Sequence, residues 1–225
     1  MTNAVVRTIA ATTHGRYLVM APAGTPAGLV VGFHGYAENG EIHLEALRAI
    51  PGIDRWVVVA VQALHPFYTR DERIVANWMT RQDRDLAIAD NLGYVGQVLE
   101  SVRNEYNVHA PLAFVGFSQG GAMAYRAATR FGADGVIVLA ADVPPDVGAE
   151  PGLRLPRVLL GRGTTDRWYT SEKHDADLAA LARAGVAVDS CVFEGGHEWG
   201  EPFRQAASLY LGRLAGGSVP HAQLD

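Results

Sequence analysis

Ser118 lies in a glycine-rich pattern that is typical of a catalytic nucleophile. The segment 116–121 reads GFSQGG and contains the pattern G-x-S-x-G, between an apolar run at 112–115 and a helical pattern that begins at 119. A very tight turn at this place strains the serine backbone, so the residues two positions before and after it must lack side chains. The turn exposes the hydroxyl at a helix N-terminus, where the helix dipole favours developing negative charge. The pattern therefore predicts a nucleophile for acyl transfer, and the alternative is a serine in an ordinary glycine-rich turn.

Asp166 and His197 are the predicted partners of Ser118. A serine hydroxyl becomes a good nucleophile when a base removes its proton and an acid orients that base. Asp166 follows the apolar run 158–160 within a glycine-rich loop, and His197 follows the last apolar run, at 186–193. The three residues thus occur in the order Ser, Asp, His, each directly after a predicted strand. We therefore predict that His197 is the general base and that Asp166 orients it.

Other aspartates and histidines are weaker candidates. Asp142 is the main competitor for the acid because it follows the apolar run 136–140, but the glycine-rich loop favours Asp166. The remaining histidines occur in loops or on predicted helix surfaces, without a glycine-rich strand end, so we expect them to be solvated. They are His14, His43, His65, His109, His174 and His221.

Acyl transfer also needs hydrogen-bond donors at the point where the carbonyl oxygen becomes an oxyanion. One predicted donor is the backbone N–H of Gln119, which directly follows the nucleophile. The second should come from the loop 34–40, after the apolar run 29–33, and we assign it to the Tyr36 N–H. His34 has no second metal ligand at suitable spacing, so we expect it to shape this loop.

Short apolar runs alternate with helical patterns along the chain. Apolar runs without polar alternation are typical of strands that are covered on both faces. A long helix is predicted at 88–106, where apolar residues recur at steps of four and three. The predicted strands are 5–9, 17–20, 29–33, 56–61, 112–115, 136–140, 158–160 and 186–193. The other predicted helices are 41–50, 119–131, 171–184 and 199–214.

This alternation predicts an α/β fold with a mostly parallel central sheet flanked by helices on both faces. Ligands of such sheets bind beyond the carboxyl ends of the strands, which is where the predicted site residues occur. We expect residues 1–215 to form a single domain and residues 216–225 to be a flexible tail. The stretch 62–79 has no clear periodicity and is long for a connection, which indicates a functional segment.

The composition argues against several classes of protein. The chain has 225 residues, a net charge of −5 and one lysine among its 19 basic residues, with no basic run. Binding to nucleic acid or to a membrane through a polybasic patch is therefore not expected. The single cysteine, Cys191, excludes an intrachain disulfide and a multi-cysteine metal site. We find no signal peptide and no membrane span in the sequence, so we expect a cytoplasmic protein without membrane insertion.

No motif in the sequence implies a metal or a cofactor. The segment 197–201 reads HEWGE and lacks the second histidine of the zinc pattern H-E-x-x-H. No glycine run matches a phosphate-binding loop or a dinucleotide fingerprint. We therefore expect neither a metal site nor a nucleotide cofactor.

Four motifs make the sequence resemble a known family, the phospholipase/carboxylesterase family of small α/β-hydrolases. That family also includes acyl-protein thioesterases and lysophospholipases. The resemblance covers about 29–214, and GFSQGG is its most specific part. The motifs are HGYAENG at 34–40, GFSQGGAMA at 116–124, GRGTTDRWY at 161–169 and GGHEW at 195–199.

The resemblance implies the α/β-hydrolase fold and gives the same catalytic residues as the spacing argument. It also implies that Trp78 lies near the substrate pocket. The sequence departs from the family in two places: the usual H-G-x-G-D is HGYAE at 34–38, and Ala140-Ala141 replaces the usual Ser-Gly. A third segment, 64–74, does not align with the family. These departures surround the expected pocket, so they affect the substrate more than the catalytic residues.

We therefore expect a serine carboxylesterase that hydrolyses a small-molecule ester through an acyl-enzyme and prefers short acyl chains. A lysophospholipase or acyl thioesterase would use the same three residues. A non-catalytic binding protein on the same fold is a third alternative, although loss of catalysis usually removes a catalytic residue or an elbow glycine. Trp78, Trp168 and Phe67 are the predicted pocket-wall residues. A homodimer is compatible with this fold, but no exposed apolar stripe requires one.

Overall fold

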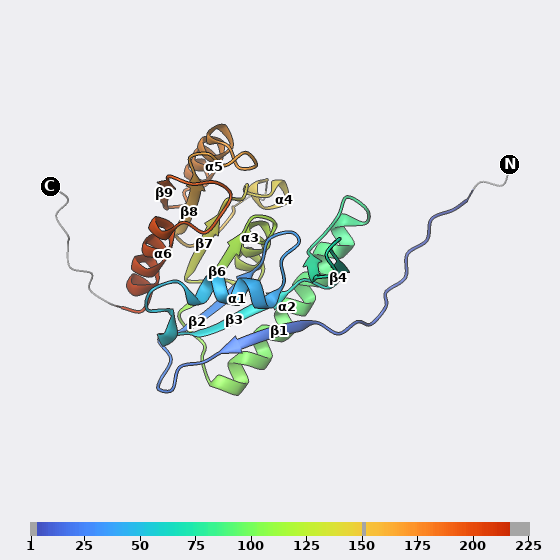
Figure 1. Cartoon of the computed structure of the whole chain (residues 1–225), viewed down its shortest axis with the longest axis horizontal. Coiled ribbons are helices and arrows are strands. Elements are labelled where there is room, and N and C mark those ends of the chain that lie inside the picture. Colours follow the sequence, from blue (N-terminus) through green and yellow to red (C-terminus); the bar gives the residue numbers. More distant parts are fainter. Residues whose placement is uncertain (1–3, 150–151, 217–225) are drawn as a thin grey trace.

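The computed structural model describes residues 4–149 and 152–216, and its centre is a seven-stranded sheet (Figure 1). The strand order is β1-β3-β2-β6-β7-β8-β9. Only β1, at one edge, is antiparallel to its neighbour, and the other pairs are parallel. The strands are β1 (Arg16–Met20), β2 (Leu29–Phe33), β3 (Val57–Gln62), β6 (Leu112–Phe117), β7 (Gly135–Leu139), β8 (Val158–Gly163) and β9 (Val188–Phe193).

Helices cover both faces of this sheet, as the strand pattern predicts. Gly32 of β2 faces α1 and Gly161 of β8 faces α6, and the register places these two glycines on the same face. Gly121 of α3 packs on Val138, which points to the opposite face. The helices are α1 (Gly40–Arg48), α2 (Arg84–Tyr106), α3 (Gln119–Phe131), α4 (Pro145–Gly148), α5 (Ser171–Arg183) and α6 (Glu201–Leu214), with a 3-10 turn at Ile53–Arg55.

The central strands form the core of the molecule. Every residue of β2, β3, β6 and β7 is buried, because helices exclude water from both faces of the sheet. Burial of a valine or leucine side chain contributes about 1.5–3 kcal/mol, so these short runs hold the sheet together. The parallel arrangement then brings the carboxyl ends of β2, β6, β8 and β9 to one edge of the sheet. The predicted site residues lie in the loops at this edge.

One strand prediction is wrong. Residues 5–9 are not a strand: they are exposed and run away from the body of the molecule (Figure 1). The side chains of Val5, Val6 and Ile9 are 69%, 85% and 94% exposed. A strand needs a neighbour that pairs with its backbone, and pairing at this edge of the sheet begins only at Arg16 of β1. Residues 5–9 therefore have no neighbouring strand to pair with among the described residues, although their apolar side chains are typical of a strand.

The unassigned stretch 62–79 contains a small hairpin. Strands β4 (His65–Tyr68) and β5 (Ile74–Asn77) pair in antiparallel register and form a separate two-stranded sheet. Thr69 holds the connecting turn. Its backbone N–H donates to the Arg73 carbonyl, and its carbonyl accepts from the Glu72 N–H. The strands are too short and too mixed in polarity to show a clear period. A bridge from Glu38 to Ala76 joins this hairpin to the loop after β2.

The remaining predicted helices occur near their predicted positions, with small shifts at their ends. Helix α2 begins at Arg84, four residues before the first residue of its apolar stripe, because its first turn contributes no residue to that stripe. Among the described residues, no helix is both long and apolar enough to cross a membrane. The predicted tail falls outside the described residues except for Gly216. The division into one domain and a tail stays a prediction.

Candidate active site

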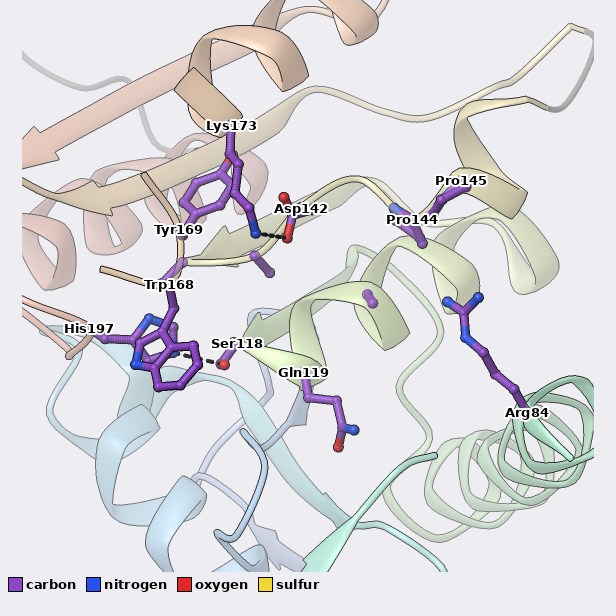
Figure 2. Close-up of a pocket in the computed structure, with 13 residues that line it drawn as sticks. Arg84, Ser118, Gln119, Asp142, Pro144, Pro145, Trp168, Tyr169, Lys173 and His197 are labelled. Atoms are coloured by element: carbon purple, nitrogen blue, oxygen red, sulfur yellow. Dashed lines mark hydrogen bonds and ion pairs between the residues drawn. The ribbon is translucent and has the colours of Figure 1, made fainter. Parts of the chain in front are cut away.

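The turn between β6 and α3 raises Ser118 above the sheet edge. Its backbone angles are φ 51° and ψ −123°, a region that residues with a side chain rarely adopt. A Cβ at Gly116 would overlap the backbone of Gly120, and a Cβ at Gly120 would overlap the carbonyl of Phe33. Both glycines of the pattern are thus required for close backbone approach. This local crowding leaves the Ser118 side chain at the N-terminus of α3 and pointing out of the turn (Figure 2).

His197 lies within hydrogen-bond distance of both residues that are predicted to act with it. His197 Nε2 lies 2.8 Å from Ser118 Oγ (Figure 2), and His197 Nδ1 lies 2.8 Å from Asp166 Oδ2. The loop that carries Asp166 and the loop that carries His197 are hydrogen-bonded to each other where they leave strands β8 and β9. Thr164 N–H donates to the Phe193 carbonyl, and Thr165 N–H donates to the Gly195 carbonyl. These bonds set the distance between Asp166 and His197.

Asp166 is buried and is fixed by several hydrogen bonds. Its Oδ1 accepts from the backbone N–H groups of Trp168 and Tyr169, at 2.8 and 2.9 Å, while Oδ2 faces His197. This arrangement orients the carboxylate and selects the tautomer of His197 with the proton on Nδ1. The competing acid, Asp142, instead accepts a hydrogen bond from Lys173 at 3.2 Å and lies at the pocket wall.

The two predicted oxyanion donors lie in the loop after β2 and at the start of α3. Within the described residues, the N–H groups of Tyr36 and Gln119 make no hydrogen bond to a backbone carbonyl. Gln119 is the first residue of α3, where helical N–H groups have no intrahelical partner. Tyr36 lies in the turn after β2, whose shape is fixed by a 2.7 Å hydrogen bond from Gly35 N–H to Glu38 Oε2. The two predicted donors therefore belong to loops that flank the nucleophile.

His34 shapes this turn. Its Nδ1 lies 2.6 Å from the Gly35 carbonyl, and its Nε2 lies 3.0 Å from the Ala63 N–H, so Nδ1 donates and Nε2 accepts. Burial lowers the pKa of His34 to about 4, which keeps the imidazole neutral near pH 7. The imidazole is thus part of the scaffold of the loop, and within the described residues it makes no hydrogen bond to Ser118.

The side chain of Gln119 has a role that the sequence did not reveal. Its Oε1 accepts from Trp78 N–H and its Nε2 donates to the Met79 carbonyl, both at 2.9 Å. Trp78 is fully buried, and its indole N–H donates to the His34 carbonyl at 2.8 Å. The prediction that Trp78 lines the pocket is therefore wrong. Its ring packs against the rings of Phe33 and His34, at the end of β2 and the start of the loop that follows.

A pocket of about 370 Å³ opens beside Ser118 and His197 (Figure 2). Trp168 lines it and is 74% exposed, whereas Phe67 is not among the lining residues and stacks on Tyr36 with ring centroids 5.7 Å apart. Phe67 therefore does not line this pocket, and its contribution to a substrate wall stays a prediction. The other lining residues are Arg84, Gln119, Ala122, Ala140, Ala141, Asp142, Pro144, Pro145, Tyr169 and Lys173.

Two histidines that we expected at the surface are buried. His43 of α1 is wholly buried against Gly32 of β2, and burial lowers its pKa to about 3. His174 of α5 lies 3.1 Å from the Ser190 hydroxyl of β9. The sequence prediction failed because each histidine lies on the helix face that packs on the sheet, and no local pattern marks that face.

The described residues hold no group of three or more histidine, cysteine, aspartate or glutamate side chains that could bind a metal ion. The groups that meet at Ser118 are its hydroxyl, the His197 imidazole and, through that ring, the Asp166 carboxylate.

Comparison with known proteins identifies structures that share the fold of this chain. No protein-family model matches the sequence, and no curated protein sequence matches it. Solved structures do match. A carboxylesterase from Mesorhizobium loti superposes with a TM-score of 0.73 at 18% identity, over 88% of this chain and 94% of that chain. A carboxylesterase from Bacillus cereus superposes with a TM-score of 0.71 at 15% identity, over 89% and 94%.

An acyl-protein thioesterase 2 from Zea mays is similar to the same extent. Its TM-score is 0.71 at 20% identity, over 90% of this chain and 100% of that chain. Because so few residues are identical, these likenesses establish a common fold. The nearly complete coverage of each partner chain agrees with that conclusion.

Proposed function

From the α/β-hydrolase fold that the chain shares with these structures, we propose that it is a serine hydrolase that cleaves carboxylic esters. The observation that carries this proposal is the position of the His197 ring. It lies 2.8 Å from Ser118 Oγ on one side and 2.8 Å from Asp166 Oδ2 on the other. A base that touches both a strained serine and a buried carboxylate is the arrangement that activates a hydroxyl nucleophile.

The acylation half of the reaction follows from this geometry. His197 Nε2 takes the proton of Ser118 Oγ while Oγ attacks the ester carbonyl carbon. The carbonyl oxygen gains negative charge and accepts hydrogen bonds from the N–H groups of Tyr36 and Gln119. The tetrahedral intermediate then breaks its bond to the alcohol oxygen, which takes the proton from His197. Ser118 is left as an acyl ester, and Asp166 holds the imidazolium through Nδ1–H.

Deacylation repeats these steps with water as the nucleophile. His197 Nε2 removes a proton from water as the water oxygen attacks the acyl carbon. The same two N–H groups stabilise the second oxyanion. Collapse of this intermediate breaks the bond to Ser118 Oγ, which regains its proton from His197, and releases the carboxylic acid. No step of this cycle requires a metal or a cofactor.

The volume of the pocket limits the length of the acyl chain that can bind in it. A volume of about 370 Å³ is near the lower limit of ligand pockets, and alanine and proline side chains narrow it. This supports short acyl chains over long ones. The same acyl-enzyme chemistry would cleave thioesters or lysophospholipids, and one structural neighbour is named an acyl-protein thioesterase. A rate panel of p-nitrophenyl esters from acetate to palmitate, with a palmitoyl thioester and a lysophospholipid, separates these alternatives.

Replacement of the nucleophile tests the proposal itself. We expect wild-type protein to hydrolyse p-nitrophenyl acetate and butyrate, and Ser118→Ala to lower kcat by at least about 10³-fold. Ser101→Ala, a change at a serine of α2, is the matched control and should retain activity. Labelling by a fluorophosphonate at Ser118 would exclude a non-catalytic protein on the same fold. Equal turnover by the wild type and Ser118→Ala would refute the proposal.

A further inference from the structure

Two positively charged side chains line the pocket beside Ser118. Arg84 comes from the first turn of α2 and Lys173 from the first turn of α5 (Figure 2). Lys173 is the single lysine of a chain whose net charge is −5. Basic side chains are therefore present in the pocket of a protein that is acidic as a whole. Neither residue takes part in the proposed acyl transfer.

Lys173 has an ion-pair partner, whereas Arg84 has none among the residues that the structure describes. Lys173 Nζ lies 3.2 Å from Asp142, and both side chains are about half exposed, at 48% and 54%. Exposed pairs of this kind are weak, so either partner can exchange for another ion. Within the described residues, Arg84 makes no ion pair and no side-chain hydrogen bond.

Asp146, whose carboxylate interacts electrostatically with Arg84, already forms an ion pair with Arg126. Arg126 is buried and donates to both oxygens of Asp146, at 2.7 and 2.8 Å. This hydrogen bonding is the main reason why the pKa of Asp146 is lowered, and Arg84 contributes less. A planar guanidinium with no partner in a concave site is well suited to bind a carboxylate through two parallel hydrogen bonds.

Alanine and proline side chains form the small apolar part of the pocket wall, and the space is large enough for a chain of a few carbons. We propose that this pocket selects esters that carry a carboxylate, which Arg84 binds directly and Lys173 attracts. This inference rests on the proposed function and names its substrate class.

Matched ester pairs test the inference on either side of the scissile bond. On the acyl side, mono-p-nitrophenyl adipate is compared with its methyl ester, with the uncatalysed rate subtracted. On the alcohol side, 4-butyryloxybenzoate is compared with its methyl ester. We expect kcat/KM for the anionic ester to exceed that for the neutral ester by about tenfold or more in one pair. The ratio should fall as salt rises from about 20 to about 300 mM, because ions screen exposed charges.

Variants with opposite expected effects separate charge from misfolding. Arg84→Leu should lower the anionic-to-neutral ratio by about tenfold. Asp142→Asn should raise the ratio, because it frees Lys173 and removes the negative charge of the wall. Loss of folding cannot produce such a gain. Arg183→Leu is the matched control: it lies at the far end of α5, about 15 Å along the axis from Lys173, and should leave the ratio unchanged.

The outcomes distinguish failure of the inference from failure of the proposed function. A ratio of one or less in both pairs, or a ratio that neither Arg84→Leu nor Asp142→Asn changes, overturns the substrate class. Turnover of the neutral esters would in that case leave the proposed hydrolase activity intact. Wild-type protein that cleaves none of the four esters overturns the proposed function, and the substrate class with it.

Discussion

Among the residues of the site with a positive backbone φ are Ser118 and Ala37, which both carry side chains. Ser118 has φ 51° and Ala37 has φ 59°. A Cβ in this region costs about 1–2 kcal/mol, so surrounding bonds must hold both residues in place. Ser118 N–H donates to the Leu139 carbonyl at 2.9 Å, and Ala37 N–H donates to the Ala76 carbonyl at 3.2 Å. The strain at Ser118 exposes its hydroxyl, whereas the strain at Ala37 has no chemical consequence that requires a side chain.

We therefore expect Ala37→Gly to stabilise the protein by about 0.5–1 kcal/mol. Relief of the left-handed strain outweighs the entropy that glycine adds to the unfolded chain. Urea unfolding of the variant and the wild type measures the difference. Ala89→Gly, within α2, is the matched control and should cost about 1 kcal/mol. Similar losses in both variants would show that position 37 is not strained.

Asp166→Asn tests the proposed role of the acid. The amide can donate to His197 Nδ1 and so favours the wrong tautomer, with the lone pair directed away from Ser118. We expect kcat for p-nitrophenyl butyrate to fall by about 10³–10⁴-fold with little change in the folded structure. Asp54→Asn, at an exposed aspartate of the 3-10 turn, should retain wild-type turnover. A loss of less than about tenfold for Asp166→Asn would mean that another group orients His197.

At the scale of elements, the site depends on how the loops after β8 and β9 pack on each other. Gly163 ends β8, and a Cβ at this position would overlap the carbonyls of Gly195 and Gly196. The loop with Asp166 and the loop with His197 can thus approach only when residue 163 has no side chain. This constraint acts on the distance between acid and base, and the Gly163 carbonyl also accepts a hydrogen bond from the Asp166 N–H at 3.2 Å.

Gly163→Ala should therefore lower both activity and stability. We expect a loss of at least about 1–3 kcal/mol in the free energy of unfolding, since backbone atoms cannot move aside as a side chain can. Gly93→Ala is the control, because a Cβ in that exposed part of α2 meets nothing within 4 Å and should add about 1 kcal/mol of helix stability. Urea unfolding and ester turnover are measured for both variants. Wild-type behaviour of Gly163→Ala would contradict the packing argument.

At the scale of the whole molecule, two buried imidazoles connect folding to pH. Burial lowers the pKa of His34 to about 4 and that of His43 to about 3, with the charge of His34 contributing to the second shift. Both side chains lie between the sheet and its covering elements, so they are neutral in the folded protein. An unfolded histidine has a pKa of about 6.5 and takes up a proton below that pH. The unfolded state therefore binds more protons than the folded state between about pH 4 and 6.5.

The sign of the pH effect follows directly. Stability rises with pH inside this window and is lost as pH falls from about 6.5, by about 1.4 kcal/mol per unit for each histidine. His43→Leu removes one of these groups, and within the described residues neither ring nitrogen of His43 has a hydrogen-bond partner to lose. We expect its loss of stability between pH 7 and pH 5 to be about 2 kcal/mol smaller than that of the wild type.

Chemical unfolding at the two pH values measures this difference. His65→Leu is the control, because His65 is exposed on the small hairpin and should keep the wild-type dependence on pH. An identical dependence in His43→Leu and the wild type would show that His43 is not buried in the neutral form.

The arrangement of strands and helices follows largely from local sequence patterns. Apolar runs without alternation mark strands that are buried on both faces, and a stripe at helical spacing marks α2. The patterns failed where structure depends on a distant partner. Residues 5–9 have an apolar run and no neighbouring strand, and the hairpin of β4 and β5 has pairing without a clear pattern. The extent of the domain and the formation of a homodimer stay predictions.

The sequence by itself determined which hydroxyl, imidazole and carboxylate meet, because each follows a parallel strand and parallel strands end at one edge. It also determined the positions of the glycines that allow those loops to approach. Only the tertiary structure decided that Trp78 and His43 are buried and that Arg84 and Lys173 face the pocket. Helix faces and loop paths depend on packing between segments far apart in the chain, and no local pattern records which neighbour a side chain will meet.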